Sequence, residues 1–290
     1  MIHIKRLSEC TLTDAVIAWN KGFEGYFFDM TTTVEQFTRR MVLEGLSPTI
    51  SVIAYDRNRP VGLILNGIRL INGKKVAWNG GTGVDPEYRG KGVSKKLIEA
   101  ALAIYEEENV DIATLEAVKG NKKAISLYEK YGYKTVDELV HLQHKGELSK
   151  DAFLSKNNSF TYIKGIPIDV SHVPFYQELI PWQTQWNSVR DGESILALDE
   201  NETIVGYVIF KRVFTDEGVL QTIVLLQCEA EPSHDHSEDI VSNLLQIVYG
   251  PSALNIVRTA ANISLTNKLL QSRLKHEGFI VKAEQVFMVK

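Results

Sequence analysis

The stretch that decides the fold is residues 80–94, which read GGTGVDPEYRGKGVS. An extended run over residues 74–84 leads into it, and apolar side chains at helical spacing follow it. These apolar positions are Val93, Leu97, Ala101 and Ile104. The turn between strand and helix presents unpaired backbone N–H groups at the positive end of a helix dipole, which favours an anion. Because Arg89 and Lys91 add positive charge and the glycines let a ligand approach the backbone, the pattern predicts a phosphate-binding loop.

Two common phosphate loops do not fit this stretch. A Walker loop places Ser or Thr after its Gly-Lys pair, whereas Gly92 follows Lys91 here. A dinucleotide fingerprint requires G-x-G-x-x-G, and the third glycine is missing. The stretch resembles instead the acyl-CoA motif of the GNAT superfamily of N-acetyltransferases, Q/R-x-x-G-x-G/A, read here as Arg89-x-x-Gly92-x-Ser94. Ser94 departs from the family's Gly or Ala, but it is small and can donate to a phosphate. Taken alone, the loop also fits a surface turn with a helix cap.

A second motif follows at residues 121–133, which read NKKAISLYEKYGY. The pattern predicts a helix that ends at Gly132, between strands over 112–118 and 133–142. It resembles the family's helix N-x-x-A-x-x-L-Y-x-x-x-G-F, with Tyr for the final Phe. The resemblance implies that Asn121 holds the cofactor, that Ala124 makes room for it, and that Tyr128 lies near the thioester sulfur. A purely structural interpretation makes Tyr128 a core aromatic, but two motifs in the right order favour the functional one.

The resemblance implies an α/β fold with a mixed α+β sheet, the GNAT acyl-CoA N-acyltransferase fold, with acetyl-CoA as co-substrate. It also implies direct transfer, in which the acceptor amine attacks the thioester, a backbone N–H near Val84 polarises the carbonyl and Tyr128 protonates the leaving thiolate. Glu116 is either a general base or a polar strand position. The residues expected to bind the cofactor are Val84, Arg89, Gly90, Lys91, Gly92, Val93, Ser94, Asn121 and Ala124.

The region before the loop is expected to bind the acceptor. The sequence predicts a strand over 2–7 and helices over 13–21 and 33–44, and in this family the connection between the first two helices lines the acceptor side of the cleft. The candidates are Trp19, Phe23, Glu24, Tyr26 and Phe27. The aromatic members could equally close the core over the sheet. Asn72-Gly73 predicts a hairpin turn, and the glycines within 74–84 predict a bulge.

Length and composition limit the class of protein. A chain of 290 residues is natural for two domains, and 44% hydrophobic and 23% charged residues are ordinary for a soluble globular protein. The start, Met1–Arg6, reads as a strand rather than a signal peptide, and no run of 18 apolar residues exists. Two distant cysteines, Cys10 and Cys228, suit a reducing cytoplasm. A net charge of −4 argues against general nucleic-acid binding, and nothing indicates a membrane partner.

A degenerate internal repeat is expected in the second half of the chain. Residues 267–279 align with the helix at 121–133 at an offset of 146. We therefore expect a catalytic GNAT domain over 1–146, a linker over 147–164 and a degenerate GNAT-like domain over 165–290. At this offset Asp235 replaces Arg89, Glu238 replaces Gly92, Leu270 replaces Ala124 and Leu274 replaces Tyr128. Residues 1–150 hold 21 basic and 19 acidic side chains, and residues 151–290 hold 11 and 17, so the second half is the more acidic.

The sequence thus predicts an acetyl-CoA-dependent N-acetyltransferase that modifies a primary amine of a small molecule or a peptide, with only the first domain active. One alternative is a non-catalytic acyl-CoA-binding regulatory module, and another is a tandem enzyme of the mycothiol-synthase kind. No metal is expected, because the run His234-Asp235-His236 lacks a further ligand pattern and reads as solvated. The sequence does not indicate an oligomeric state.

Overall fold

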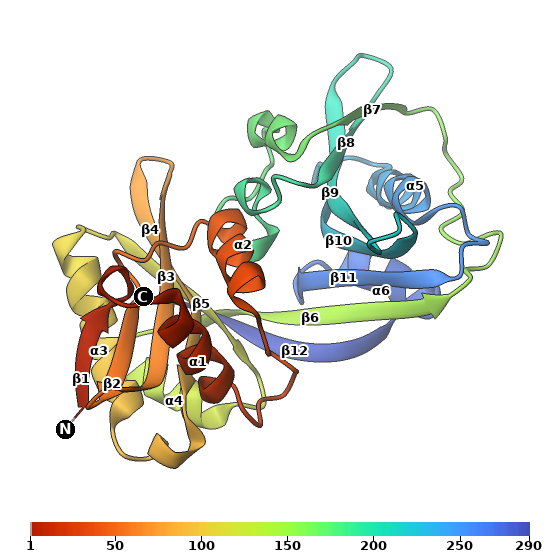
Figure 1. Cartoon of the computed structure of the whole chain (residues 1–290). Helices are drawn as coiled ribbons and strands as arrows, with labels where there is room; N and C mark the ends of the chain where they lie inside the picture. Colours follow the sequence, from red (N-terminus) through yellow and green to blue (C-terminus); the bar gives the residue numbers. More distant parts are fainter. Residues whose placement is uncertain (1) are drawn as a thin grey trace. The chain divides into compact units, whose positions relative to one another are not determined.

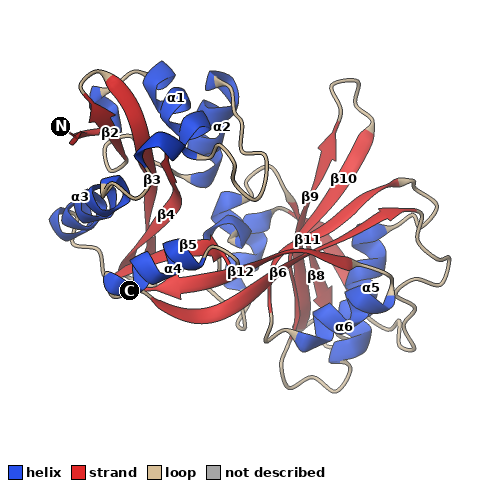
Figure 2. Ribbon diagram, turned by 90° about the horizontal axis from the view of Figure 1, so that it is seen from below, coloured by secondary structure: helices blue, strands red, loops and turns tan. Residues whose placement is uncertain are grey.

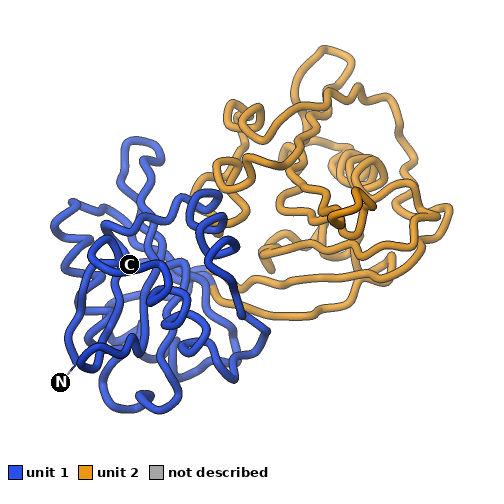
Figure 3. The backbone as a smooth tube through the Cα atoms, viewed as in Figure 1, with its two compact units in different colours: residues 1–136, 287–290 blue, residues 137–286 orange. Residues whose placement is uncertain are grey.

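The computed structural model describes residues 2–290. Met1, the first residue of the predicted strand Met1–Arg6, lies outside the described residues. The chain divides into two compact units, one of residues 1–136 with 287–290 and the other of residues 137–286 (Figure 3). Each unit is a mixed sheet with helices packed on it (Figures 1 and 2). Within residues 2–290, no helix is both long and apolar enough to cross a membrane.

The first unit contains the glycine-rich stretch. Its strands are β1 (Ile2–Arg6), β2 (Val52–Asp56), β3 (Arg59–Ile71), β4 (Lys74–Val84) and β5 (Ile112–Val118). Its helices are α1 (Leu12–Gly22), α2 (Val34–Glu44), α3 (Val93–Glu107) and α4 (Lys122–Lys130). The strands follow one another in the sheet in chain order. In Figure 2, α1 and α2 lie on one face of β2–β4 and α3 lies on the other. Ala113 of β5 exchanges two backbone hydrogen bonds of 2.9 Å with Lys290.

Most predicted elements of this unit are present. Thr33 caps α2 in a reciprocal capping box with Gln36, as its position predicts. Asn72 and Gly73 both have positive φ, which is the conformation that a type I′ hairpin turn requires. The register of β3 with β4 shifts where Leu65 faces Gly81 and Asn66 faces Asn79, so Gly80 is the extra residue of a bulge. The predicted bulge is therefore confirmed.

The second unit repeats the later part of this order, with three short 3₁₀ turns between β7 and β8 where the first unit has α1 and α2. Its strands are β6 (Lys134–Gly146, of which the first residues belong to the first unit), β7 (Thr161–Gly165), β8 (Glu193–Leu198), β9 (Ile204–Phe214), β10 (Leu220–Ala230), β11 (Ile256–Ser264) and β12 (Ile280–Val289). Its helices are α5 (Ser237–Tyr249) and α6 (Lys268–His276). The sheet order is β12-β6-β11-β10-β9-β8-β7. The bounds of β10 and α6 lie 146 residues after those of β4 and α4, which is the predicted offset.

The compact units differ from the predicted segments 1–146, 147–164 and 165–290. Strand pairing is the cause, because most of β6 pairs with β11 of the second unit, whereas the last residues of β12 pair with β5 of the first. Part of the predicted linker is also packed: Phe153 and Phe160 are 1% and 8% exposed and belong to the core of the second unit. Which segments act as functional domains stays a prediction.

Candidate active site

The predicted phosphate loop lies between β4 and α3 in the first unit. A single 3₁₀ turn, Pro86–Tyr88, leaves the strand, and α3 begins after its N-cap Gly92. Gly90 and Gly92 have φ of 74° and 81°, a conformation that other residues adopt at a cost. Because the N-cap of α3 is a glycine, no side-chain hydrogen bond caps this helix start in the described residues 2–290. The N–H groups of its first turn, which include Val93 and Ser94, are therefore available to an anion.

The side chain of Arg89 makes three hydrogen bonds to carbonyl oxygens of its own unit. Its Nε donates to Val84 O at 2.9 Å, and its Nη2 donates to Gly22 O at 3.1 Å and to Glu24 O at 2.8 Å. Gly22 is the last residue of α1, where a helix has unpaired carbonyls and negative partial charge, and Glu24 follows two residues later. Lys91, by contrast, is exposed, with its Nζ 5.6 Å from the ring centroid of Tyr88. Cofactor binding by the loop stays a prediction.

Strands β4 and β5 pair in parallel from Val76 and Ile112 only as far as Asn79 and Leu115. Both strands continue beyond that point, β4 to Val84 and β5 to Val118, so they separate after the last pair.

Tyr128 of α4 lies beside this separation. It is 8% exposed, and its hydroxyl is within hydrogen-bonding reach of Thr82 and Asn79 on β4. Burial raises the pKa of Tyr128 to about 12, so the hydroxyl keeps its proton at neutral pH. Its ring also packs against Tyr133, with centroids 5.8 Å apart, which fits the core interpretation, while its chemical role stays a prediction. Thr82 and Asn79 escaped the sequence analysis, because strict alternation places residues three apart on opposite faces of a strand and the bulge at Gly80 changes the register between them.

Asn121 begins α4 and joins it to the predicted acceptor residues. Its Oδ1 accepts from the N–H of Ala124 at 3.3 Å, and its side chain is within hydrogen-bonding reach of the hydroxyl of Tyr26. Burial raises the pKa of Tyr26, and the bond from Asn121 opposes this shift. Phe27 lies against the preceding residue, because a β-carbon built on Gly120 would be 3.3 Å from Phe27 Cε1. Tyr26 and Phe27 therefore lie next to Asn121 and Gly120, and Asn121 is the residue expected to hold the cofactor.

Residues 23–31 form most of the connection between α1 and α2 and border a cavity of about 510 Å³. They are called here the acceptor segment, after the role that the sequence predicts for them. The cavity is lined by Asn20, Lys21 and all residues of the acceptor segment. Trp19 is 2% exposed and donates from Nε1 to Met30 O at 2.7 Å, so it supports the segment from the core. Phe23 is also buried, whereas Phe27 is 54% exposed. Glu24 is exposed and pairs with Lys21 at 2.8 Å.

Helix α1 packs against β4 through glycines. A β-carbon built on Gly83 would lie 3.1 Å from Gly22 Cα, and one built on Gly81 would lie 2.9 Å from the Trp19 ring. Glycines in β4 thus permit close packing of α1 as well as the bulge. Arg40 of α2 escaped the sequence analysis, although it stacks 4.6 Å from the Trp19 ring centroid and donates to Gly80 O at 2.7 Å.

Glu116 lies on β5, one residue beyond the last pair with β4. Its carboxylate accepts a hydrogen bond of 2.6 Å from Nε1 of Trp78. The bond orients the carboxylate, and its role as a base stays a prediction. Among residues 2–290, no group of three or more His, Cys, Asp or Glu side chains could hold a metal ion.

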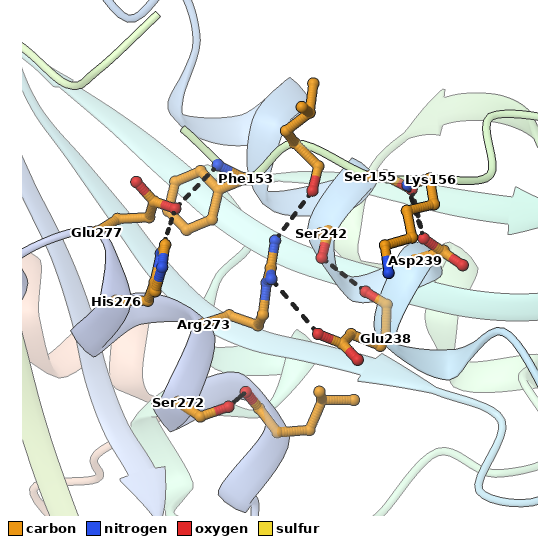
Figure 4. Close-up of polar contacts among 12 residues, drawn as sticks. Phe153, Ser155, Lys156, Glu238, Asp239, Ser242, Ser272, Arg273, His276 and Glu277 are labelled. Carbon is orange, nitrogen blue, oxygen red and sulfur yellow. Dashed lines mark hydrogen bonds and ion pairs between the residues drawn. The ribbon is translucent and has the colours of Figure 1, made fainter. Parts of the chain in front are cut away.

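The second unit carries different chemistry at the matching positions (Figure 4). Glu238, at the position of Gly92, forms an ion pair of 3.4 Å with Arg273. Asp239 accepts hydrogen bonds from Ser155 Oγ at 2.8 Å and from the N–H of Lys156 at 3.0 Å. The N-terminal turn of α5 therefore presents two carboxylates where a diphosphate would need positive potential. Leu270 and Leu274, at the positions of Ala124 and Tyr128, are 1% and 0% exposed in the core.

Comparison with known proteins agrees with this geometry. Residues 13–133 match the profile of the Acetyltransferase (GNAT) family. N-alpha-acetyltransferase 30 of Saccharomyces cerevisiae is 33% identical over 94 residues, which cover 30% of this chain and 52% of the yeast protein. The chain thus spans about half the length of the curated relative that it matches.

Solved structures resemble the whole chain in fold. A GCN5-related glucosamine N-acetyltransferase region of a fungal multi-domain β-N-acetylglucosaminidase aligns over 99% of this chain and 38% of that one, with a TM-score of 0.68 and 14% identity. A tandem GNAT protein from the clavulanic acid biosynthesis pathway aligns over 100% of this chain and 98% of that one, with a TM-score of 0.63 and 12% identity. The chain therefore has a GNAT fold, and the match to the family's profile lies within the first unit, at residues 13–133.

Proposed function

We propose that the protein is an acetyl-CoA-dependent N-acetyltransferase whose first unit alone is catalytic. One observation carries the proposal: the buried hydroxyl of Tyr128 lies where β4 and β5 separate, in the same unit as the uncapped, glycine-rich start of α3. The first feature supplies an acid, and the second supplies an anion site.

The residues of the first unit fit the co-substrate. The N–H groups at the start of α3 would hold the diphosphate, and Lys91 would add positive charge without a strong competing partner. Ala124 leaves room beside Asn121 at the start of α4. Backbone groups of β4 beyond Asn79 would then face the thioester end, since the parallel pairing with β5 has ended there.

The same residues account for transfer in one step. An uncharged amine would attack the thioester carbonyl, whose developing negative charge an N–H near Val84 would stabilise. The C–S bond would break as the N–C bond forms, and Tyr128 would give its proton to the thiolate of CoA. Because burial raises the pKa of Tyr128 to about 12, this proton is retained until it is needed. The amine's surplus proton would pass to Glu116 or to water.

The acceptor is a primary amine of a small molecule or a peptide, bound against the acceptor segment. The name of the yeast relative points to an α-amine of a protein, and that of the fungal region points to an amino sugar. Both acceptor classes belong in a screen for CoA release. A chain that binds acetyl-CoA but modifies no amine would instead be an acyl-CoA-binding regulatory module.

Tyr128→Phe tests the acid, because it keeps the ring and removes only the hydroxyl. We expect kcat to fall by about 10² to 10⁴, with acetyl-CoA affinity unchanged. Tyr133→Phe is the matched control, since it removes a hydroxyl from the neighbouring buried ring. Equal loss in both variants, or a lower melting temperature with kcat retained, would assign Tyr128 to packing alone. In wild type, activity should persist through pH 10, where an ordinary tyrosine loses its proton, because the acid form is lost only near pH 12.

A further inference from the structure

Arg89 connects two parts of the first unit that are far apart in sequence. Its guanidinium bonds to Val84 O at the end of β4 and to Gly22 O and Glu24 O, which lie 67 and 65 residues earlier in the chain. Glu24 is the second residue of the acceptor segment. The side chain therefore ties the start of the acceptor segment to the strand that leads into the phosphate loop.

These bonds compete with a role on the diphosphate. Hydrogen bonds from a charged group are stronger than those between neutral groups, although solvent weakens them here because Arg89 is exposed. Turning the guanidinium towards a phosphate would break bonds to carbonyls that have no helical N–H partner at the end of α1. The N–H groups of α3 and the ammonium of Lys91 can meet the phosphate without such a loss.

The remainder of the acceptor segment is held independently of Arg89. Trp19 bonds to Met30 O near its end, and Tyr26 bonds to Asn121 in its middle. Asn20 exchanges two hydrogen bonds with Thr32, the residue that follows the segment. Arg89 therefore controls chiefly the first part of the segment, which borders the cavity at Phe23 and Glu24.

We propose that Arg89 is a positioning residue, which holds the acceptor segment in place and so sets the affinity for the acceptor, while backbone N–H groups and Lys91 bind the diphosphate. The proposal rests on the proposed function for the identity of the acceptor. It departs from the role that the motif assigns to this arginine, because the guanidinium acts on the neighbouring segment rather than on the cofactor.

The test compares Arg89→Ala and Arg89→Lys with Lys91→Ala in the full chain. Calorimetry gives the Kd for acetyl-CoA, steady-state kinetics gives the KM for the best amine, and hydrogen exchange reports on residues 23–31. For both Arg89 variants we expect a Kd within about threefold of wild type and a KM raised about tenfold. Exchange should be at least about tenfold faster over residues 23–25, the part of the segment that Arg89 holds. For Lys91→Ala we expect the Kd to weaken about tenfold and exchange in the segment to stay unchanged.

A Kd weakened about tenfold or more in Arg89→Lys, or unchanged exchange over residues 23–31, overturns the proposal. Arg89→Lys keeps the charge but cannot bridge β4 and α1 through a planar fork, so it remains informative should Arg89→Ala fold poorly. If wild type acetylates no amine, the proposed function fails. The Kd and the exchange rates still decide the role of Arg89 in that case, since neither requires turnover.

Discussion

Residues 287–290 complete the sheet of the first unit, although most of the strand that carries them belongs to the second. Met288 is 0% exposed and Phe287 is 3% exposed. Met288→Ala would remove a buried side chain, and large-to-small changes of this kind cost about 2–5 kcal/mol. Because the pair between Ala113 and Lys290 lies two residues further on, we expect β5 to lose protection.

Hydrogen exchange over β5 (Ile112–Val118) measures this effect. A cost of about 2–5 kcal/mol, at about 1.4 kcal/mol for each factor of ten, accelerates exchange from about 30-fold to several thousand-fold if these amides exchange through unfolding of the unit. Ile280→Ala, on the same strand but 57% exposed, is the control and should change stability by less than about 0.5 kcal/mol. Unchanged protection of β5 in Met288→Ala would refute the view that this strand stabilises the first unit.

Two further predictions concern the second unit. Burial raises the pKa of Glu229 from 4.5 to about 7, so ionisation costs wild type stability as pH rises from 4.5 to 7. Glu229→Gln should therefore raise the free energy of unfolding by about 3 kcal/mol at pH 8 and by little at pH 4, as measured by urea denaturation. An equal gain at both pH values would contradict burial as the cause. Because Glu238 and Leu270 replace Gly92 and Ala124, calorimetry on the full chain should give one acetyl-CoA per chain, and a stoichiometry near two would show that the second unit also binds.

Much of the first unit could be predicted because its signals are local. The phosphate loop, the capping box at Thr33 and the turn at Asn72-Gly73 each depend on a few consecutive residues whose backbone preferences agree. The internal repeat was visible for the same reason, since equal spacing of similar segments needs no knowledge of contacts. These features predict the fold class, and they predict Tyr128 as a residue of the active site.

Long-range pairing could not be predicted in this way. The three oxygens bonded by Arg89 are ordinary backbone carbonyls, so no residue type marks them, and two of them lie more than sixty residues away. The partner of Ala113 is Lys290, and nothing in a strand's own sequence names its neighbour in the sheet. The segment 147–164 shows a related limit: its polar composition predicts a linker, and composition alone does not show that Phe153 and Phe160 pack into the core of the second unit.

The two units share the strand geometry of their sheets but differ in the side chains next to the point where the parallel strands separate. The parallel pair β10–β11 ends at Leu225 and Ala260, which matches the end of β4–β5 at Asn79 and Leu115, so both sheets open at the same place. In the first unit that opening is bordered by small residues and a tyrosine hydroxyl. In the second, Glu229 stands at the position of Gly83 and is held by Asn267 at 2.8 Å. The opening therefore follows from strand geometry, which both halves keep, whereas the side chains beside it differ between the two units.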